Sequence, residues 1–191
     1  MQLFQVHVPI WVFIISQVFG LLYLIIFSYA LQIKDKSKTL KWYAIGNILS
    51  IFSNALLLNF VLVGTKSVSF FKNISFSWLQ KNRGKTSKLF SFFILVFFIL
   101  LAYIVGIFTW NGLWFNWVLI SMLAISYYGE WHKNIHLLRI GSFLYISAVF
   151  VNALMFTNVA DMIMCMITVV AIIFFYLRLY KDKKTQKRLP Q

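Results

Sequence analysis

Seven long apolar segments, separated by short links that carry most of the charge, fill nearly all of this chain of 191 residues. A helix needs about 20 apolar residues to cross the roughly 30 Å hydrocarbon core of a bilayer, and within lipid it must pair its backbone groups internally. The segments therefore predict an all-α, polytopic membrane protein with seven transmembrane helices. They cover roughly residues 10–31, 42–62, 65–80, 89–108, 112–128, 137–156 and 160–179.

Composition agrees with a single membrane domain spanning residues 1–191. Hydrophobic residues make up 61% of the chain and charged residues only 12%, whereas a soluble domain is about half apolar and a quarter charged. Lysine and arginine outnumber aspartate and glutamate by 18 to 4, but they cluster in the links between apolar segments. This placement favours a membrane topology signal over a nucleic-acid-binding surface.

The loop charges predict the orientation of the chain. Residues 65–80 are the least apolar segment, and the loops at 32–41 and 81–88 each carry four lysine or arginine residues. If 65–80 spans the membrane, both basic loops lie in the cytoplasm, as the positive-inside rule requires. The N-terminus is then outside, and the basic tail at 181–191 is cytoplasmic. We expect that tail to bind anionic lipids.

An internal repeat is indicated by self-alignment of the chain. A shift of 98 residues lays 28–85 on 126–183 without a gap, with 13 identities in 58 positions. This register joins the first three helices to the last three and leaves 89–108 as a linker. The pattern predicts a 3+1+3 arrangement of two parallel halves, which is a known transporter plan.

Polar side chains recur at helical spacing on three segments: Asn47, Ser50 and Asn54; Ser142, Tyr145 and Asn152; Asp161, Cys165 and Thr168. Such faces either line a cavity or hydrogen-bond helices together, and the sequence leaves both alternatives open. If they line a cavity, Asn54 and Asn152, which match in the repeat, would hydrogen-bond a ligand. Lys72 would then select against cations or hold an anionic group. The candidate ligand-binding residues are Asn54, Asn152, Ser50, Tyr145, Lys72 and Thr168.

Ionisable residues within the spans are few. We expect Lys72 to be the only lysine well inside a span, either at a site or snorkelling to the interface. Asp161 is expected to be the only acid there, in the first turn of the last helix, where it complements the helix dipole. Glu130, with His132 and His136, is expected in a cytoplasmic loop.

Catalytic motifs are absent from the sequence. It contains no His-Glu-x-x-His, Gly-x-Ser-x-Gly or glycine-rich phosphate loop. The spacing of His132 and His136 suits a metal on a helix, but no third histidine or cysteine is near them. We therefore expect neither an enzyme nor a cofactor nor a bound metal.

The chain resembles the YgjV-type family of small bacterial inner-membrane proteins. The motifs that carry the resemblance are Gly106-Ile-Phe-Thr-Trp-Asn-Gly112, Lys133-Asn-Ile-His-Leu-Leu-Arg139, Arg178 before the basic tail, the stretch from Gln32 to Lys38, and Leu56-Leu57-Leu58. The resemblance implies a bacterial inner-membrane location and a plan similar to SWEET-like sugar carriers and PnuC-type vitamin transporters. It implies no activity.

The chain also departs from that family. Cys165 stands where the family commonly has an acid in the last helix. Lys72, Asn73 and Ser75 stand where the family commonly has an arginine in the third helix.

Two functions remain in view. The first is a facilitator or transporter of a small polar molecule, which alternates access between two three-helix halves. The second is a non-transporting membrane scaffold or accessory subunit, in which the polar faces are purely structural. The sequence identifies neither a substrate nor an oligomeric state.

Overall fold

The computed structural model describes residues 8–82, 84–109, 112, 114–155 and 158–186. This part of the chain forms seven α-helices joined by short links, which confirms the all-α prediction. The helices are α1 (Ile10–Gln32), α2 (Lys36–Leu56), α3 (Phe60–Lys81), α4 (Lys88–Phe108), α5 (Phe115–Trp131), α6 (Ile135–Met155) and α7 (Val159–Gln186).

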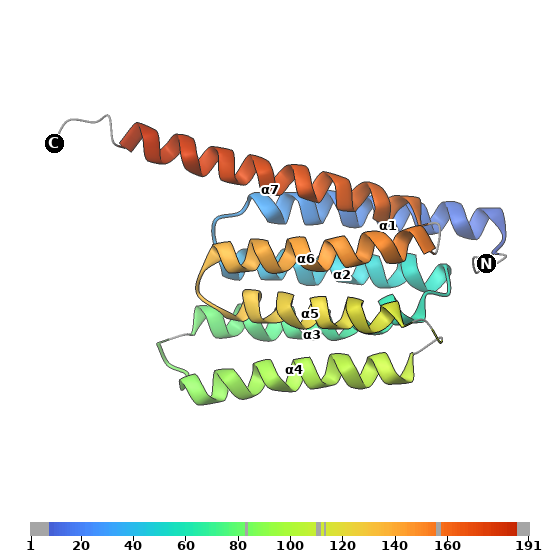
Figure 1. The fold of residues 1–191 in the computed structure, drawn as a ribbon, viewed down its shortest axis with the longest axis horizontal. Helices are drawn as coiled ribbons and strands as arrows, with labels where there is room; N and C mark the ends of the chain where they lie inside the picture. The colour runs from blue at the N-terminus through green and yellow to red at the C-terminus, as the bar shows by residue number, and fades with distance from the viewer. Residues whose placement is uncertain (1–7, 83, 110–111, 113, 156–157, 187–191) are drawn as a thin grey trace.

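The helices lie nearly parallel, and α5, α6 and α7 are drawn in front of α3, α2 and α1 (Figure 1). α1, α2 and α3 pack side by side in chain order, and so do α5, α6 and α7. α1 also packs against α7, and α3 packs against α5, so that these six helices close a ring. α4 lies outside the ring against α3 and α5.

Four of the helices are long and apolar enough to cross a membrane, which makes the chain an integral membrane protein with several spans. They cover Ile10–Gln32, Lys88–Phe108, His136–Met155 and Val159–Arg178. α2 and α3 have the length but less mean hydropathy, because they bury polar side chains inside the bundle, and α5 has only 17 residues. α4 is the most apolar helix, and most of its large side chains point outward.

Several helix boundaries differ from those expected, because helices begin at capping residues and not where hydrophobicity begins. Asp35 caps α2 by accepting from the backbone N–H of Lys38 at 3.1 Å, so α2 starts six residues before the predicted 42. α3 begins after the cap Asn59 and has 22 residues in place of the 16 expected for 65–80. α5 ends at Trp131, beyond the predicted 128.

Three further charged residues lie inside helices, and Glu130 is the one that a shifted boundary places there. Lys66 lies in the second turn of α3, Glu130 in the last turn of α5 and Arg139 in the second turn of α6. All three are buried. The expectations that Lys72 would be the only lysine and Asp161 the only acid within a span were therefore wrong.

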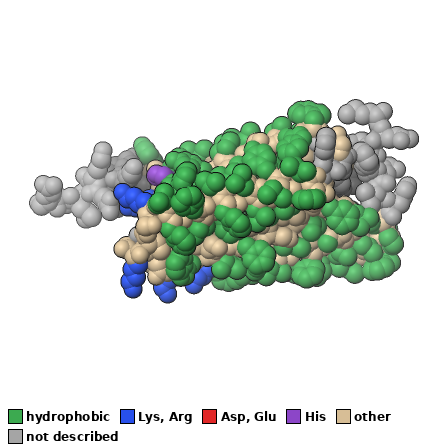
Figure 2. All heavy atoms as spheres, turned by 90° about the horizontal axis from the view of Figure 1, so that it is seen from below, with side chains coloured by type: hydrophobic (Ala, Val, Ile, Leu, Met, Phe, Trp, Pro, Cys, Tyr) green, Lys and Arg blue, Asp and Glu red, His purple; other side chains and the backbone are tan. Residues whose placement is uncertain are grey.

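Exposed lysines gather at one end of the molecule, which we call the basic end (Figure 2). They lie in or beside the links α1–α2, α3–α4 and α5–α6, at Lys34, Lys38, Lys41, Lys81, Lys85, Lys88 and Lys133. The opposite links at 57–59, 109–114 and 156–158 contain no lysine or arginine. α7 extends along the backbone to Gln186, so the predicted tail begins as helix, and residues 187–191 lie outside the described part.

The two halves share their helix spacing. α6 begins 99 residues after α2, and α7 begins 99 residues after α3, one more than the register that aligns the sequences. α2 and α6 both have 21 residues. The internal repeat over 28–85 and 126–183 nevertheless stays a prediction.

Close approach of α5 and α6 depends on two glycines. A Cβ on Gly129 would meet the carbonyl oxygen of Leu137, and one on Gly141 would lie 2.9 Å from the Cα of Ser126. Both neighbours are backbone atoms, which cannot move aside as the end of a flexible side chain does. The glycines therefore bring Ser126 and Glu130 of α5 close to α6.

Candidate functional site

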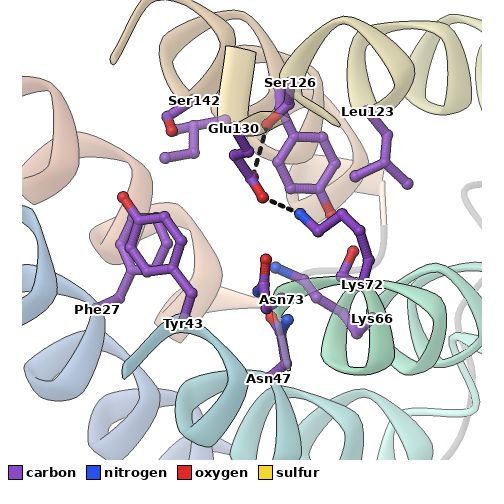
Figure 3. Close-up of a pocket in the computed structure, with 13 residues that line it drawn as sticks. Phe27, Tyr43, Asn47, Lys66, Lys72, Asn73, Leu123, Ser126, Glu130 and Ser142 are labelled. Atoms are coloured by element: carbon purple, nitrogen blue, oxygen red, sulfur yellow. Dashed lines mark hydrogen bonds and ion pairs between the residues drawn. The ribbon is translucent and has the colours of Figure 1, made fainter. Parts of the chain in front are cut away.

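A cavity of about 30 Å³ lies inside the ring of helices (Figure 3). This volume holds about two water-sized groups at roughly 10–15 Å³ each. It lies between the middle of the bundle and the basic end, because its α2 and α6 residues come from the first half of each helix, or just past it. Its lining comes from five helices: Phe27 (α1); Tyr43 and Asn47 (α2); Lys66, Ser69, Lys72 and Asn73 (α3); Leu123, Ser126 and Glu130 (α5); Ser142, Tyr145 and Ile146 (α6).

A buried ion pair crosses the cavity from one half to the other. The ammonium group of Lys72 on α3 donates to the carboxylate of Glu130 on α5 (Figure 3). Ser126 donates to the other carboxylate oxygen at 3.1 Å. The same ammonium lies 4.2 Å from the ring centroid of Tyr127, a favourable cation–π position. Both charges are thus compensated inside the bundle.

A second ammonium group faces the cavity without such compensation. Lys66 is 3% exposed, and its Nζ donates to the hydroxyl of Tyr23 at 3.0 Å. It lies over the rings of Tyr23 and Tyr145, 4.8 and 5.2 Å from their centroids. Among the described residues, no carboxylate lies within ion-pairing distance of it.

Three buried polar atoms of the lining have no hydrogen-bond partner among the described residues. They are Nδ2 of Asn47, Oδ1 of Asn73 and the hydroxyl of Tyr145. A buried polar group without a partner is unfavourable by about 1–3 kcal/mol. The cavity therefore has hydrogen-bonding capacity that the protein itself does not use.

Arg139 closes the basic side of this region. It is fully buried and donates to the carbonyl oxygen of Leu31 at 2.6 Å and to the hydroxyl of Tyr43 at 3.4 Å. Its guanidinium also lies 4.7 Å from the ring centroid of Phe175. One side chain of α6 thus contacts α1, α2 and α7.

Polar contacts join the two halves at both ends of the bundle. At the basic end, Lys36 donates to the carbonyl oxygens of Gly129, at 3.0 Å, and His132. Gln80 donates there to the carbonyl oxygen of Trp131 at 3.1 Å. At the opposite end, Nδ2 of Asn59 donates to Oδ1 of Asn152 at 2.9 Å.

The six predicted ligand-binding residues are all buried, and two of them line this cavity. Lys72 and Tyr145 line the cavity, whereas Asn54, Asn152, Ser50 and Thr168 do not. Asn54 donates to the carbonyl oxygen of Ser50 at 2.9 Å, and Thr168 donates to that of Met164 at 2.7 Å. Oδ1 of Asn54 and Nδ2 of Asn152 have no partner among the described residues, so a ligand role for these two asparagines stays a prediction.

Sequence reasoning missed Lys66 and Glu130, although helical spacing holds a signal for both. Lys66, Ser69 and Asn73 follow the i, i+3, i+7 pattern of one helix face, and Ser126 and Glu130 are four residues apart. Asp161 does lie in the first turn of α7, as expected, and its carboxylate accepts from Asn158 at 2.8 Å.

Metal chemistry receives no support from the described residues, which contain no group of three or more histidine, cysteine, aspartate or glutamate side chains able to hold an ion. His136 stacks on Tyr176 with 5.6 Å between ring centroids.

Comparisons of the chain with protein-family models, curated proteins and solved structures found no match. The candidate site therefore rests on its own geometry.

Proposed function

We propose that this protein is a facilitator or transporter of a small polar molecule, and that it alternates access between the halves α1–α3 and α5–α7. The observation that carries the proposal is a cavity between the halves that is lined mainly by buried polar side chains, with cross-half contacts at both ends. In an alternating-access carrier, the binding site lies between two such halves, which rock against each other.

The two sets of contacts have the properties of gates. Separating α2 and α3 from the end of α5 breaks the hydrogen bonds of Lys36 and Gln80 and opens the cavity to the basic end. Separating Asn59 from Asn152 opens the other end. The bonds of Lys36, Gln80 and Asn59 are hydrogen bonds, which between membrane helices average only about 0.6 kcal/mol. Opening the basic end must also separate Lys72 from Glu130 and Arg139 from Leu31, which join the same two halves.

A scaffold or accessory subunit is the alternative, since hydrogen bonds between helices also stabilise proteins that transport nothing. The two functions differ in whether the cavity opens. Ser69 lines the cavity and is bonded to Tyr127, whereas Ser16 is bonded to Ser53 away from it. This pair supplies a test position and its control.

The test uses the buried, free Cys165 replaced by serine, with Ser69→Cys or Ser16→Cys added, in the protein reconstituted into liposomes. A membrane-impermeant thiol reagent is applied from each side in turn. A transporter exposes position 69 from both sides and position 16 from neither. A cavity that never opens leaves position 69 unreactive from both sides, which contradicts the proposal and favours the scaffold.

A further inference from the structure

We infer that the cavity binds a compact, singly charged anion, either an inorganic ion or the carboxylate group of a larger solute, with Lys66 as its counter-ion. The role of this anion in transport rests on the proposed function. The binding site itself is inferred from the charges and the unpaired hydrogen-bonding groups that line the cavity. The residues that carry it are Lys66, Asn47 and Tyr145.

The charge of the lining is the first argument. Two ammonium groups and one carboxylate line the cavity, and the carboxylate of Glu130 is already bound by Lys72 and Ser126. Asp161 lies near enough to Lys66 to interact electrostatically, but its side chain is bonded to Asn158 and does not line the cavity. A buried ammonium without a directly paired anion is unfavourable. An anion in the cavity would complete the pairing.

Unused hydrogen-bond donors are the second argument. An ammonium group has three donors, and the described contacts of Lys66 include one hydrogen bond, to Tyr23. Asn47 and Tyr145 line the same cavity and are 5% and 9% exposed. The amide nitrogen of Asn47 and the hydroxyl of Tyr145 have no hydrogen-bond partner that meets the geometric criteria among the described residues. In Figure 3, Lys66 and Asn47 enter the same space from α3 and α2. Donors from three helices thus converge where one acceptor-rich group fits.

The size and the single free acceptor define the ligand further. About 30 Å³ has room for roughly two water-sized groups, which suits a monatomic ion or a carboxylate group. Oδ1 of Asn73 is also unpartnered and would accept from a hydroxyl or amine next to a carboxylate. Through this contact, the site would distinguish a carboxylate that carries a hydroxyl or an amine from chloride or nitrate.

Binding is tested with the full-length protein in detergent micelles at constant sodium concentration, with a bulky sulfonate such as MES, which carries no carboxylate, replaced by chloride, nitrate or formate. The midpoint of thermal unfolding should rise with at least one of these anions, since a ligand that binds only the folded state stabilises it. Preference for formate would identify a carboxylate ligand, and equal or stronger effects of chloride and nitrate would identify an inorganic anion. Identical midpoints in all four salts would overturn the inference.

Variants locate the site. Lys66→Met should abolish the anion-dependent rise, whereas Lys41→Met, at an exposed lysine of the basic end, should retain it. Tyr145→Phe removes one hydroxyl from the lining and keeps the ring that faces Lys66, so it should fold normally, yet weaken anion affinity about tenfold, because hydrogen bonds to charged groups are strong. Tyr145→Phe therefore decides the matter if Lys66→Met fails to fold, and an unchanged affinity in it would contradict the site.

The result of the anion-binding test can be distinguished from the result of the thiol-access test of transport. An anion response that Lys66→Met abolishes supports the site even if position 69 is never reached from either side, which would contradict transport alone. Access to position 69 from both sides without any anion response would support transport and overturn the anion site.

Discussion

Lys72 and Glu130 form a buried ion pair that joins α3 in the first half of the chain to α5 in the second. Neither residue is near the other in sequence, and each supplies the only charge that directly compensates its partner among the described residues. In a low-dielectric interior, removal of one partner leaves an uncompensated charge, which is far more unfavourable than removal of both.

Single replacement of this pair is therefore expected to destabilise the protein strongly. Lys72→Met or Glu130→Gln should lower the free energy of unfolding by about 3–5 kcal/mol, measured by denaturant titration in micelles. The double variant should be more stable than the Lys72→Met single variant. A double variant whose loss equals the sum of the two single losses would show that the two groups do not interact.

Gly129 is expected to tolerate no side chain. Gly129→Ala places a Cβ against the carbonyl oxygen of Leu137, so α5 and α6 must separate, and overpacking of this kind destabilises by about 1–3 kcal/mol. Gly84→Ala is the matched control, because a Cβ there meets nothing within 4 Å. Equal thermal stability of the two variants would mean that the contact between α5 and α6 is looser than described.

Asn54→Leu and Asn152→Leu decide between a ligand role and a structural role for these asparagines. Asn152 accepts from Asn59, and Asn54 bonds its own helix. We expect Asn152→Leu to lower thermal stability, by about 0.6 kcal/mol for the lost hydrogen bond, and Asn54→Leu to have a smaller effect. If they bind a ligand instead, transport would be lost while the amount of folded protein stays normal.

The orientation follows from the lysines at the basic end. A reporter that is active only in the cytoplasm should work when fused after residue 84 or residue 191 and fail after residue 111, because basic loops remain in the cytoplasm. Activity of the fusion at 111 with inactivity at 84 would reverse the predicted topology.

The basic tail at 181–191 should bind anionic lipids. It carries five lysine and arginine residues between 181 and 188, each contributing about 1 kcal/mol near an anionic surface. A peptide of residues 179–191 should bind vesicles that contain anionic lipid, and salt should weaken the binding. Binding that is independent of both salt and anionic lipid would contradict an electrostatic mechanism.

The sequence by itself determined the helical class, the number of helices and the end at which positive charge gathers. Segment length and hydropathy are local quantities, and lipid permits no other backbone arrangement for such segments. The same reasoning identified Lys72 and Tyr145 as lining candidates, since a polar side chain in an apolar helix must face the interior. Boundaries were less accurate, because the caps Asp35 and Asn59 lie outside the apolar segments.

Only the tertiary structure decided which polar groups meet. Glu130 lies one residue from the end of its helix, and sequence cannot show that the close approach of α5 to α6 buries it opposite Lys72. Lys66 lies over the rings of Tyr23 and Tyr145, which come from other helices. Asn54 and Asn152 match in the sequence repeat, yet both lie beyond the cavity. The physical reason is that pairing depends on the rotation and separation of helices distant in the chain, which no local pattern specifies.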